Sequence, residues 1–294
     1  MANFDDLLTN TPAEESAPQL SKEEYAAKKK AEREEVFAQS DQTALEVAGD
    51  GGKFAQFLDL QARLDRYSAV NALLTFAKNP GASRLGSFDY WKRQNCSVKP
   101  GQTAIAILEP QEYTKDDGTP GTGYAVRKVF DISQVDTRKL RNTPPSHYTE
   151  RQLLSALISK SPVKIMGVDD LPGDLGAMTD PETDSILVRK GMEFTDTFRS
   201  LVKELSFADL TTGADTQADP HFSAYCASYL LCRKYGVDTQ GFSFEDAPSV
   251  LDGMDAQEIK GELAQIRDAT ENISGRMARQ LEAQQKTAKN QDVR

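Results

Sequence analysis

The chain has 294 residues, of which 38% are hydrophobic and 27% are charged, and its formal net charge at pH 7 is -10. This length allows one large or two ordinary domains, each with a core of its own. No run of about 18 apolar residues occurs, and the first residues contain neither a basic nor an apolar stretch. These features exclude a membrane-spanning helix and a secretory signal, so we expect a cytoplasmic protein without a membrane partner.

Charged residues are unevenly distributed along the chain. Residues 1–50 hold 5 Lys or Arg against 12 Asp or Glu, residues 51–131 hold 11 against 8, and residues 132–294 hold 19 against 25. The overall acidity argues against nucleic-acid binding along the whole chain, but an average can conceal a local patch. Only residues 51–131 form a basic segment.

The three cysteines, Cys96, Cys226 and Cys232, are odd in number and lack paired Cys-x-x-Cys spacing. Disulfide bonds and a structural zinc site are therefore disfavoured. A metal site made of His221, Cys226 and Cys232 is an alternative, but spacings of five and six residues spread these side chains over different faces of a helix. We expect reduced, buried cysteines and neither a metal nor a cofactor.

The N-terminal third is predicted to be helical after a disordered start. Residues 1–20 are polar without a period and are expected to be disordered. Residues 20–40 are polar nearly all round, with Glu-to-Lys spacings typical of an exposed helix. Apolar residues then recur at helical spacing over residues 54–77, until Asn-Pro-Gly at 79–81 stops the pattern. We predict one long amphipathic helix, and a kinked form of it is the alternative.

A small sheet is predicted next. Residues 87–95 are typical of a short helix, and residues 102–110 alternate as a strand with one buried face. Residues 112–134 add turn residues and a second strand, which predicts a hairpin. Helices followed by a small antiparallel sheet make an α+β module over residues 51–136.

The second half begins after a Pro-Pro pair in a polar stretch, which predicts a linker at residues 137–148. Gly236 is a plausible C-cap of a helix. The predicted elements after the linker are a helix at 150–160, strands at 163–168 and 185–190, helices at 197–210 and 222–236, and a long helix in 255–285 that frays into a polar tail. The predicted organisation is a disordered and helical leader (1–50), an α+β domain (51–136), a linker (137–148), a second α+β domain (149–254) and a C-terminal helix with its tail (255–294).

Residues 66–110, followed by residues 128–134, resemble the N-terminal single-stranded-DNA-binding domain of ArdC-type antirestriction proteins and their LtrC-like relatives on conjugative elements. The resemblance covers roughly residues 54–135. The matching residues are Tyr67, Ser68, Asn71, Trp91, Val98, Lys99, Gly101, Ile105, Leu108, Pro110, Phe130, Asp131, Ser133 and Gln134.

Residues 176–210 and 221–253 resemble the zinc metallopeptidase-like domain that follows in that family, which implies a zincin-like α+β fold. The expected His-Glu-x-x-His motif, which places two zinc ligands on one helix face, runs here from Lys203 through Glu204 to Phe207. Tyr225 aligns with the further acidic ligand of the family. Lys203, Phe207 and Tyr225 occupy the three expected ligand positions, and none of them is a usual zinc ligand, so the resemblance implies an inactive domain.

The vestigial site is expected to be a plugged core or at most a dry pocket. Lys203 is expected to pair with Glu204 or a neighbouring acid, Phe207 to fill the cavity, and Tyr225 to close it with its hydroxyl. Glu204 as a general base without a metal is the less favoured alternative, because nothing would then activate the water or polarise the carbonyl.

Proteins bind single-stranded DNA with Lys and Arg side chains that neutralise the phosphate backbone and with aromatic rings on which the bases stack. Aromatic residues interleaved with Lys and Arg are therefore typical of such a site. Each aromatic, Trp91 in particular, is on its own more often a core residue than a stacking platform. The family resemblance favours DNA binding. The candidate DNA-binding residues are Arg66, Tyr67, Asn71, Arg84, Tyr90, Trp91, Lys92, Arg93, Lys99, Tyr124, Arg127 and Lys128.

The sequence therefore predicts a non-enzymatic, single-stranded-DNA-binding accessory protein of a mobile genetic element. Its partners would be single-stranded DNA and either another protein of the same element or a host restriction enzyme. A protein-interaction scaffold that never contacts DNA is the alternative, and an active peptidase dependent on Glu204 is a third hypothesis.

Overall fold

The structure is a computed structural model that describes residues 21–114, 118–140, 147–213 and 218–291. It confirms the α+β class: helices dominate, and three small sheets lie outside them. The predicted disorder of residues 1–20, the hairpin tip, part of the linker and the end of the polar tail fall outside the described residues. No helix in the described part of the chain combines the length and apolar character needed to cross a membrane.

Helix α2 (Lys22–Ala48) begins with a capping box, in which the Ser21 side chain accepts from the Glu24 amide and the Glu24 side chain accepts from the Ser21 amide. The helix is predicted correctly, but its second half is not a solvated leader. Val36, Ala44 and Val47 are among its buried residues, and the helix packs along α4 and the long C-terminal helix.

The predicted helix over residues 54–77 is wrong, because the chain forms two helices, α3 (Gly51–Arg63) and α4 (Ala69–Lys78). Gln61 stabilises the turn between them: its Nε2 donates to the carbonyls of Leu64 (3.3 Å) and Tyr67 (3.2 Å). Ser68 then caps α4 by accepting from a backbone amide three residues on. The turn residue Leu64 is buried, so the apolar pattern continues across the break and does not reveal it.

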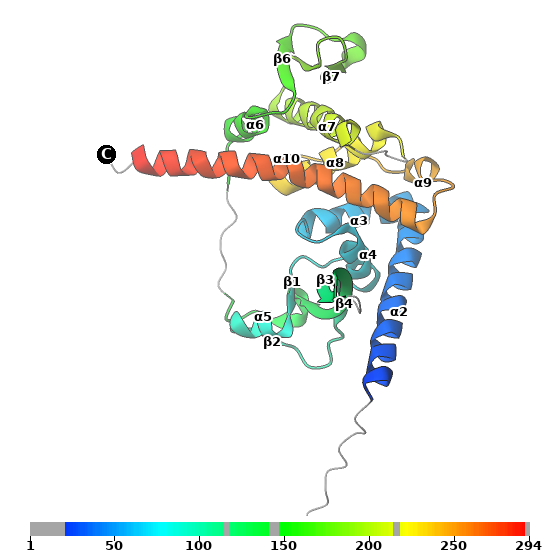
Figure 1. Cartoon of the computed structure of the whole chain (residues 1–294). Helices are drawn as coiled ribbons and strands as arrows, with labels where there is room; N and C mark the ends of the chain where they lie inside the picture. Colours follow the sequence, from blue (N-terminus) through cyan, green and yellow to red (C-terminus); the bar gives the residue numbers. More distant parts are fainter. Residues whose placement is uncertain (1–20, 115–117, 141–146, 214–217, 292–294) are drawn as a thin grey trace, which may run out of the picture.

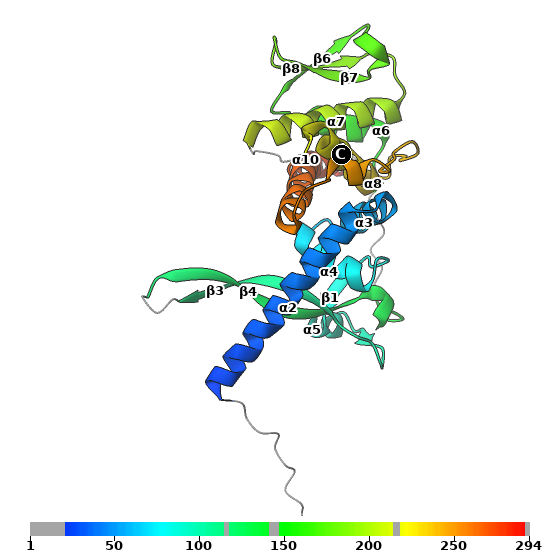
Figure 2. The same cartoon turned by 90° about the vertical axis from the view of Figure 1, so that its right-hand side faces the viewer.

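The predicted hairpin is confirmed. Strands β3 (Ile105–Thr114) and β4 (Pro120–Asp131) pair antiparallel, from Ile105 opposite Val129 to Thr114 opposite Pro120, and the hairpin projects from the molecule beside α2 (Figure 2). Strand β1 (Leu85–Ser87) pairs with the other edge of β4, and the predicted short helix is α5 (Phe88–Arg93). The remaining elements here are β2 (Ser97–Val98), its partner β5 (Val135–Asp136) and the 3-10 turn η1 (Ile132–Gln134).

The second half contains helices and a small sheet. The elements in chain order are α6 (Glu150–Ile158), β6 (Lys164–Val168), η2 (Pro172–Asp174), β7 (Ala177–Asp180), β8 (Ser185–Arg189), α7 (Phe194–Gly213), α8 (Pro220–Tyr235), α9 (Ala247–Val250) and α10 (Ala256–Gln291). The three strands form a sheet of order β6-β8-β7, in which β6 is parallel and β7 antiparallel to β8. Gly236 ends α8 in the left-handed conformation (φ 69°), as predicted.

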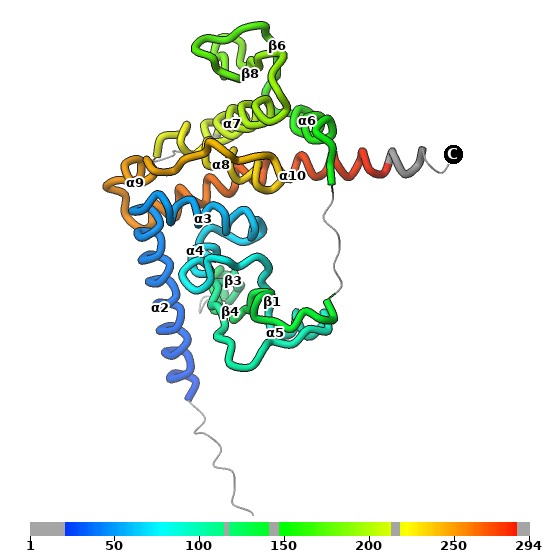
Figure 3. The backbone as a smooth tube through the Cα atoms, turned by 180° about the vertical axis from the view of Figure 1, so that it is seen from behind, coloured from blue at the N-terminus to red at the C-terminus, as the bar shows by residue number. Residues whose placement is uncertain are grey.

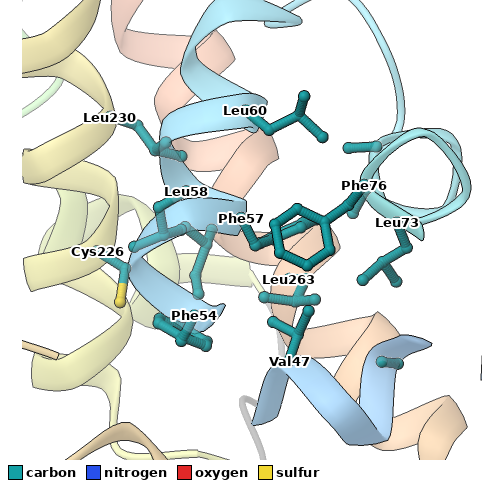
Figure 4. Packing of buried hydrophobic residues seen from close by; sticks show 14 of the residues in the cluster. Val47, Phe54, Phe57, Leu58, Leu60, Leu73, Phe76, Cys226, Leu230 and Leu263 are labelled. Carbon is teal, nitrogen blue, oxygen red and sulfur yellow. The ribbon is translucent and has the colours of Figure 1, made fainter. Parts of the chain in front are cut away.

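Helix α10 runs between the two halves of the molecule (Figures 1 and 3). Its first turns, with Leu263 and Ile266, join a hydrophobic cluster that also contains residues of α2, α3, α4, β1, β3, β4 and α8. Its later turns, with Ile273 and Met277, join a second cluster with α6, β7, β8, α7 and α8. Figure 4 shows Leu263 close to Phe57 of α3. Helices α8 and α10 therefore contribute residues to both clusters.

Polar contacts add to this junction. Asp59 of α3 accepts a hydrogen bond from the Tyr229 hydroxyl at 2.7 Å and pairs with Arg233 at 2.9 Å. Asp65 pairs with Lys234 at 2.8 Å. All three partners project from α8. The cysteines are free and buried, as predicted.

Replacing Leu263 by alanine tests the shared core. Leu263 is 2% exposed, so we expect Leu263→Ala to lower the free energy of unfolding by about 2–5 kcal/mol. Leu45→Ala is the matched control, because Leu45 is 46% exposed and should cost less than about 0.5 kcal/mol. Urea unfolding followed by circular dichroism measures both; equal losses would contradict a core that depends on α10.

Candidate nucleic-acid interface

A groove of about 800 Å³ lies between the α3–α4 turn, β1, the start of α5 and the outer face of the β3–β4 hairpin. We call it the basic groove. Five cationic and three acidic side chains line it together with two tyrosines. These residues are Arg63, Arg66, Arg84, Arg127, Lys128, Asp65, Asp89, Glu109, Tyr67 and Tyr90.

The cations of the basic groove differ in how they are held. Arg63 donates to the carbonyls of Ala82 (2.9 Å) and Pro80 (2.7 Å), so it pins the loop before β1. Arg66 and Lys128 are exposed, and neither makes a hydrogen bond or an ion pair with the residues that the structure describes. These two charges are therefore available to a ligand.

Arg127 pairs with Glu109 across the hairpin at 2.9 Å, and both side chains are more than half exposed. An exposed pair of this kind contributes only about 0–1 kcal/mol. The Arg127 guanidinium can therefore leave the Glu109 carboxylate and bind a phosphate with little loss of free energy.

The tyrosines form the wall of the basic groove next to β1. The Arg84 guanidinium donates to the Tyr90 hydroxyl at 2.6 Å and lies 5.7 Å from the centre of the Tyr90 ring. A Cβ at Gly86 would lie 2.2 Å from the Tyr90 ring, so only glycine permits this close packing. The Tyr67 hydroxyl faces the Leu85 carbonyl at 3.4 Å, and partial burial raises the pKa of Tyr67.

Asp131 fixes the loop before β1, which lines the basic groove. Its carboxylate is 1% exposed and accepts from the amides of Ser83 (2.8 Å), Arg84 (3.0 Å) and Ser133 (2.9 Å). Burial opposes its ionisation, but hydrogen bonds from Ser133, Arg84 and Ser83 outweigh burial and lower the pKa of Asp131. The loop that carries Arg84 is thereby fastened to the end of β4.

Six of the predicted DNA-binding residues line the basic groove, namely Arg66, Tyr67, Arg84, Tyr90, Arg127 and Lys128. They come from the α3–α4 turn, the loop before β1, α5 and β4, so only the tertiary fold brings them together.

Two candidates cannot contact a nucleic acid in this structure. Trp91 is fully buried, and its indole Nε1 donates to the Phe130 carbonyl at 2.9 Å. Asn71 is 9% exposed, and its side-chain amide pairs with both backbone groups of Leu108 at 2.8 Å. Trp91 fills a core and Asn71 ties α4 to β3, which corrects the expectation for both side chains.

The remaining candidates lie away from the basic groove. Lys92 and Arg93 are exposed on α5. Lys99 is exposed as well and donates to the Ser133 carbonyl at 2.9 Å.

Tyr113, which sequence reasoning missed, is 51% exposed on the hairpin and lines a cavity of about 400 Å³ with Arg33 and the candidate Tyr124. The signal that could have found Tyr113 is the strand alternation from Gln111, which places both side chains on one face.

The helix aligned with the peptidase motif is α7, and its glutamate has a structural partner. Glu204 is 9% exposed, and its Oε2 accepts from the Thr179 amide at 2.9 Å and the Thr179 hydroxyl at 2.8 Å. Glu204 therefore links α7 to strand β7. The expected pairing of Glu204 with Lys203 is wrong, since no ion pair joins them within the described chain.

The surroundings of the other aligned positions also differ from expectation. The Phe207 ring stacks on the His221 ring, with centroids 4.3 Å apart and planes at 10°. The Tyr225 hydroxyl accepts from the Ser243 amide at 2.9 Å. Lys203 and Tyr225 line a pocket of about 230 Å³ with Arg199. Phe207 is not among the residues that line this pocket, and two cationic side chains are.

The architecture matches two solved structures of the antirestriction protein ArdC from plasmid R388, one metal-free and one bound to Mn(II). Each match has a TM-score of 0.50 at 14% identity and covers 72% of this chain, with 86% and 85% of the ArdC chain covered. The fold is ArdC-like. No protein-family model matches the sequence, and no curated protein matches it significantly. The similarity is therefore seen at the level of tertiary structure.

Asp131→Asn tests the anchor of this ArdC-like groove. The asparagine side chain would place an NH₂ donor against the backbone N–H donors that Asp131 now accepts from. We therefore expect a loss of about 1–3 kcal/mol in the free energy of unfolding at pH 7. The pKa of Asp131 in the folded protein is lowered relative to its value of about 3.9 in the unfolded chain. Its stabilisation is therefore complete above that unfolded value and is lost as pH falls through the folded pKa.

Urea unfolding from neutral to acidic pH measures this effect. The difference between the original protein and Asp131→Asn should stay constant down to about pH 4 and shrink below it. Asp252→Asn is the control, because Asp252 is exposed. A difference that grows in acid would refute the assignment.

Two substitutions of Glu204 test its structural contact with Thr179. Glu204→Ala removes the acceptor of two hydrogen bonds and should cost about 1–3 kcal/mol in unfolding free energy. Glu204→Gln keeps one carbonyl oxygen for Thr179 and should cost less. Thermal and urea unfolding compare the two variants, and identical losses would argue against the Thr179 contact.

Proposed function

We propose that the protein binds single-stranded DNA in the basic groove, as an accessory protein of a mobile genetic element. The observation that carries this proposal is the set of exposed cations that line one groove with Tyr67 and Tyr90. Arg66 and Lys128 make no ion pair in the described part of the chain, and the ion pair of Arg127 with Glu109 is exposed. Cations without partners are suited to phosphates, and tyrosine rings are suited to unstacked bases.

The chemistry favours a single strand over a duplex. A stacking contact needs a base whose face is free, and each such contact contributes about 1–3 kcal/mol. Tyr113 and Tyr124, which are 51% and 48% exposed on the hairpin, extend the aromatic surface beyond the groove. The nearby acids Asp65, Asp89 and Glu109 limit the positions that a phosphate can occupy.

The setting in a mobile element is supported by the fold. ArdC of plasmid R388 is an antirestriction protein, and its fold is similar to that of this chain. We therefore propose an antirestriction or conjugation role, with another protein of the element or a host restriction enzyme as a further partner.

The second half acts in this proposal as an inactive scaffold. One of the ArdC structures holds Mn(II), so the fit of a metal to this chain has to be considered. Lys203, Phe207 and Tyr225, the residues aligned with the family's ligands, offer no imidazole, thiolate or carboxylate, and the Lys203 ammonium would repel a cation. Glu204 is engaged by Thr179. These residues do not fit a metal, and we assign no hydrolysis to the site.

Fluorescence anisotropy of a labelled oligo(dT) strand, titrated at low and moderate salt beside a matched duplex, tests the proposal. We expect saturable binding that prefers the single strand and weakens with salt. The double variant Arg66→Glu, Lys128→Glu should bind at least about tenfold more weakly at low salt. The slope of log K against log salt should fall by roughly 0.7 for each lost phosphate contact.

The matched control is the double variant Arg151→Glu, Lys164→Glu, which makes the same charge change at exposed positions of α6 and β6. It should bind as the original protein does. No binding of any strand at low salt would eliminate the DNA proposal and leave the protein-interaction scaffold. Equal weakening in both double variants would assign binding to overall charge instead of the groove.

A further inference from the structure

The pocket of about 230 Å³ lies between α7, α8 and the loop that follows α8. We call it the cationic pocket. Helix α7 lines it with Arg199, Ser200 and Lys203, α8 lines it with Tyr225, and the loop lines it with Phe242. No aspartate or glutamate of the described residues is part of the lining. The pocket is smaller than the range of about 300–1,000 Å³ that small-ligand sites occupy, so it suits one small chemical group.

The Lys203 ammonium is the uncompensated charge of the cationic pocket. Ser200 and Lys203 are three residues apart on α7, so their side chains share one helix face. Lys203 is partly exposed and makes no hydrogen bond or ion pair with the residues that the structure describes. The next residue, Glu204, is bonded to Thr179 instead. An anion that enters the pocket therefore finds a cation without a competing carboxylate.

Two hydroxyl groups of the cationic pocket also have a proton to donate. The Tyr225 hydroxyl accepts from the Ser243 amide at 2.9 Å, and its own proton has no acceptor among the described residues. Ser200 is partly exposed, and its hydroxyl makes no hydrogen bond within the described ranges. Ammonium and hydroxyl groups are hydrogen-bond donors. The pocket thus gathers three donors and lacks the acceptor that would satisfy them.

Arg199 has a different role, because it is already paired. Its Nε donates to the Asp238 carbonyl at 2.8 Å, and a terminal nitrogen pairs with the Asp238 carboxylate at 3.2 Å. The guanidinium also lies 5.5 Å from the centre of the Phe242 ring. Arg199 therefore fastens the loop to α7, and Asp238 balances its charge. Lys203 leaves the pocket with one net positive charge, which a monoanion would match and a phosphate dianion would exceed.

We propose that the cationic pocket binds one carboxylate, supplied by an aspartate or glutamate side chain of a protein partner. The carboxylate accepts a charge-assisted hydrogen bond from Lys203, and its other lone pairs accept from the hydroxyls of Tyr225 and Ser200. Because the pocket holds only the end of a side chain, the rest of the partner lies over the exposed loop residues Gln240 and Gly241. This inference holds whether or not the basic groove binds DNA.

The blocked peptide acetyl-Gly-Glu-Gly-amide, which carries a single carboxylate, tests the proposal beside its glutamine counterpart. Two-dimensional NMR of the full chain at constant ionic strength follows the backbone amides of Gly241 and Ser243, which lie at the pocket. We expect saturable shifts with the glutamate peptide and none with the glutamine peptide. Lys203→Met removes the charge and should weaken binding at least about tenfold, since it removes a charge-assisted hydrogen bond.

Lys164→Met is the matched control, because it removes the same charge at an exposed position of β6 and should leave binding unchanged. Ser200→Ala is a second variant, which keeps the charge and should cause a smaller loss than Lys203→Met. No saturable shift with the glutamate peptide, equal shifts with both peptides, or unchanged binding in Lys203→Met would overturn the proposal. Tighter binding of inorganic phosphate at the same amides would also overturn it, and would assign the pocket to a phosphoryl group.

Discussion

The burial of one apolar stripe along α10 is the constraint on which the whole structure depends. Leu263 and Ile266 pack into the cluster with the N-terminal helices and sheet, while Ile273 and Met277 pack into the cluster with α6, α7 and the second sheet. Helix α10 therefore contributes side chains to the cores of both halves.

Buried polar groups with complete sets of partners position the basic groove. Asp131 fastens the loop before β1, and Asn71 replaces a strand partner for Leu108. Trp91 fills the space beneath α5. All three are among the residues that carry the family resemblance. Their contacts indicate that they maintain the shape of the groove, whereas the exposed Arg66 and Lys128 supply its charge.

The second half uses a buried carboxylate as a structural group. Glu204 of α7 accepts two hydrogen bonds from Thr179, and these bonds hold β7 on α7. Phe207 gains a partner ring in His221. A carboxylate that is buried and hydrogen-bonded in this way stabilises the fold without a metal.

The sequence by itself determined what depends on neighbours along the chain. Helix α2, the β3–β4 hairpin and the left-handed Gly236 could be predicted, because helix periodicity, turns and caps are local. Only the tertiary structure decided which side chains are exposed and which ones meet. Burial of Trp91 against Phe130, the contact of Glu204 with Thr179, and the gathering of Arg66 and Lys128 along one groove depend on segments that are apart in sequence, so residue chemistry along the chain does not reveal them.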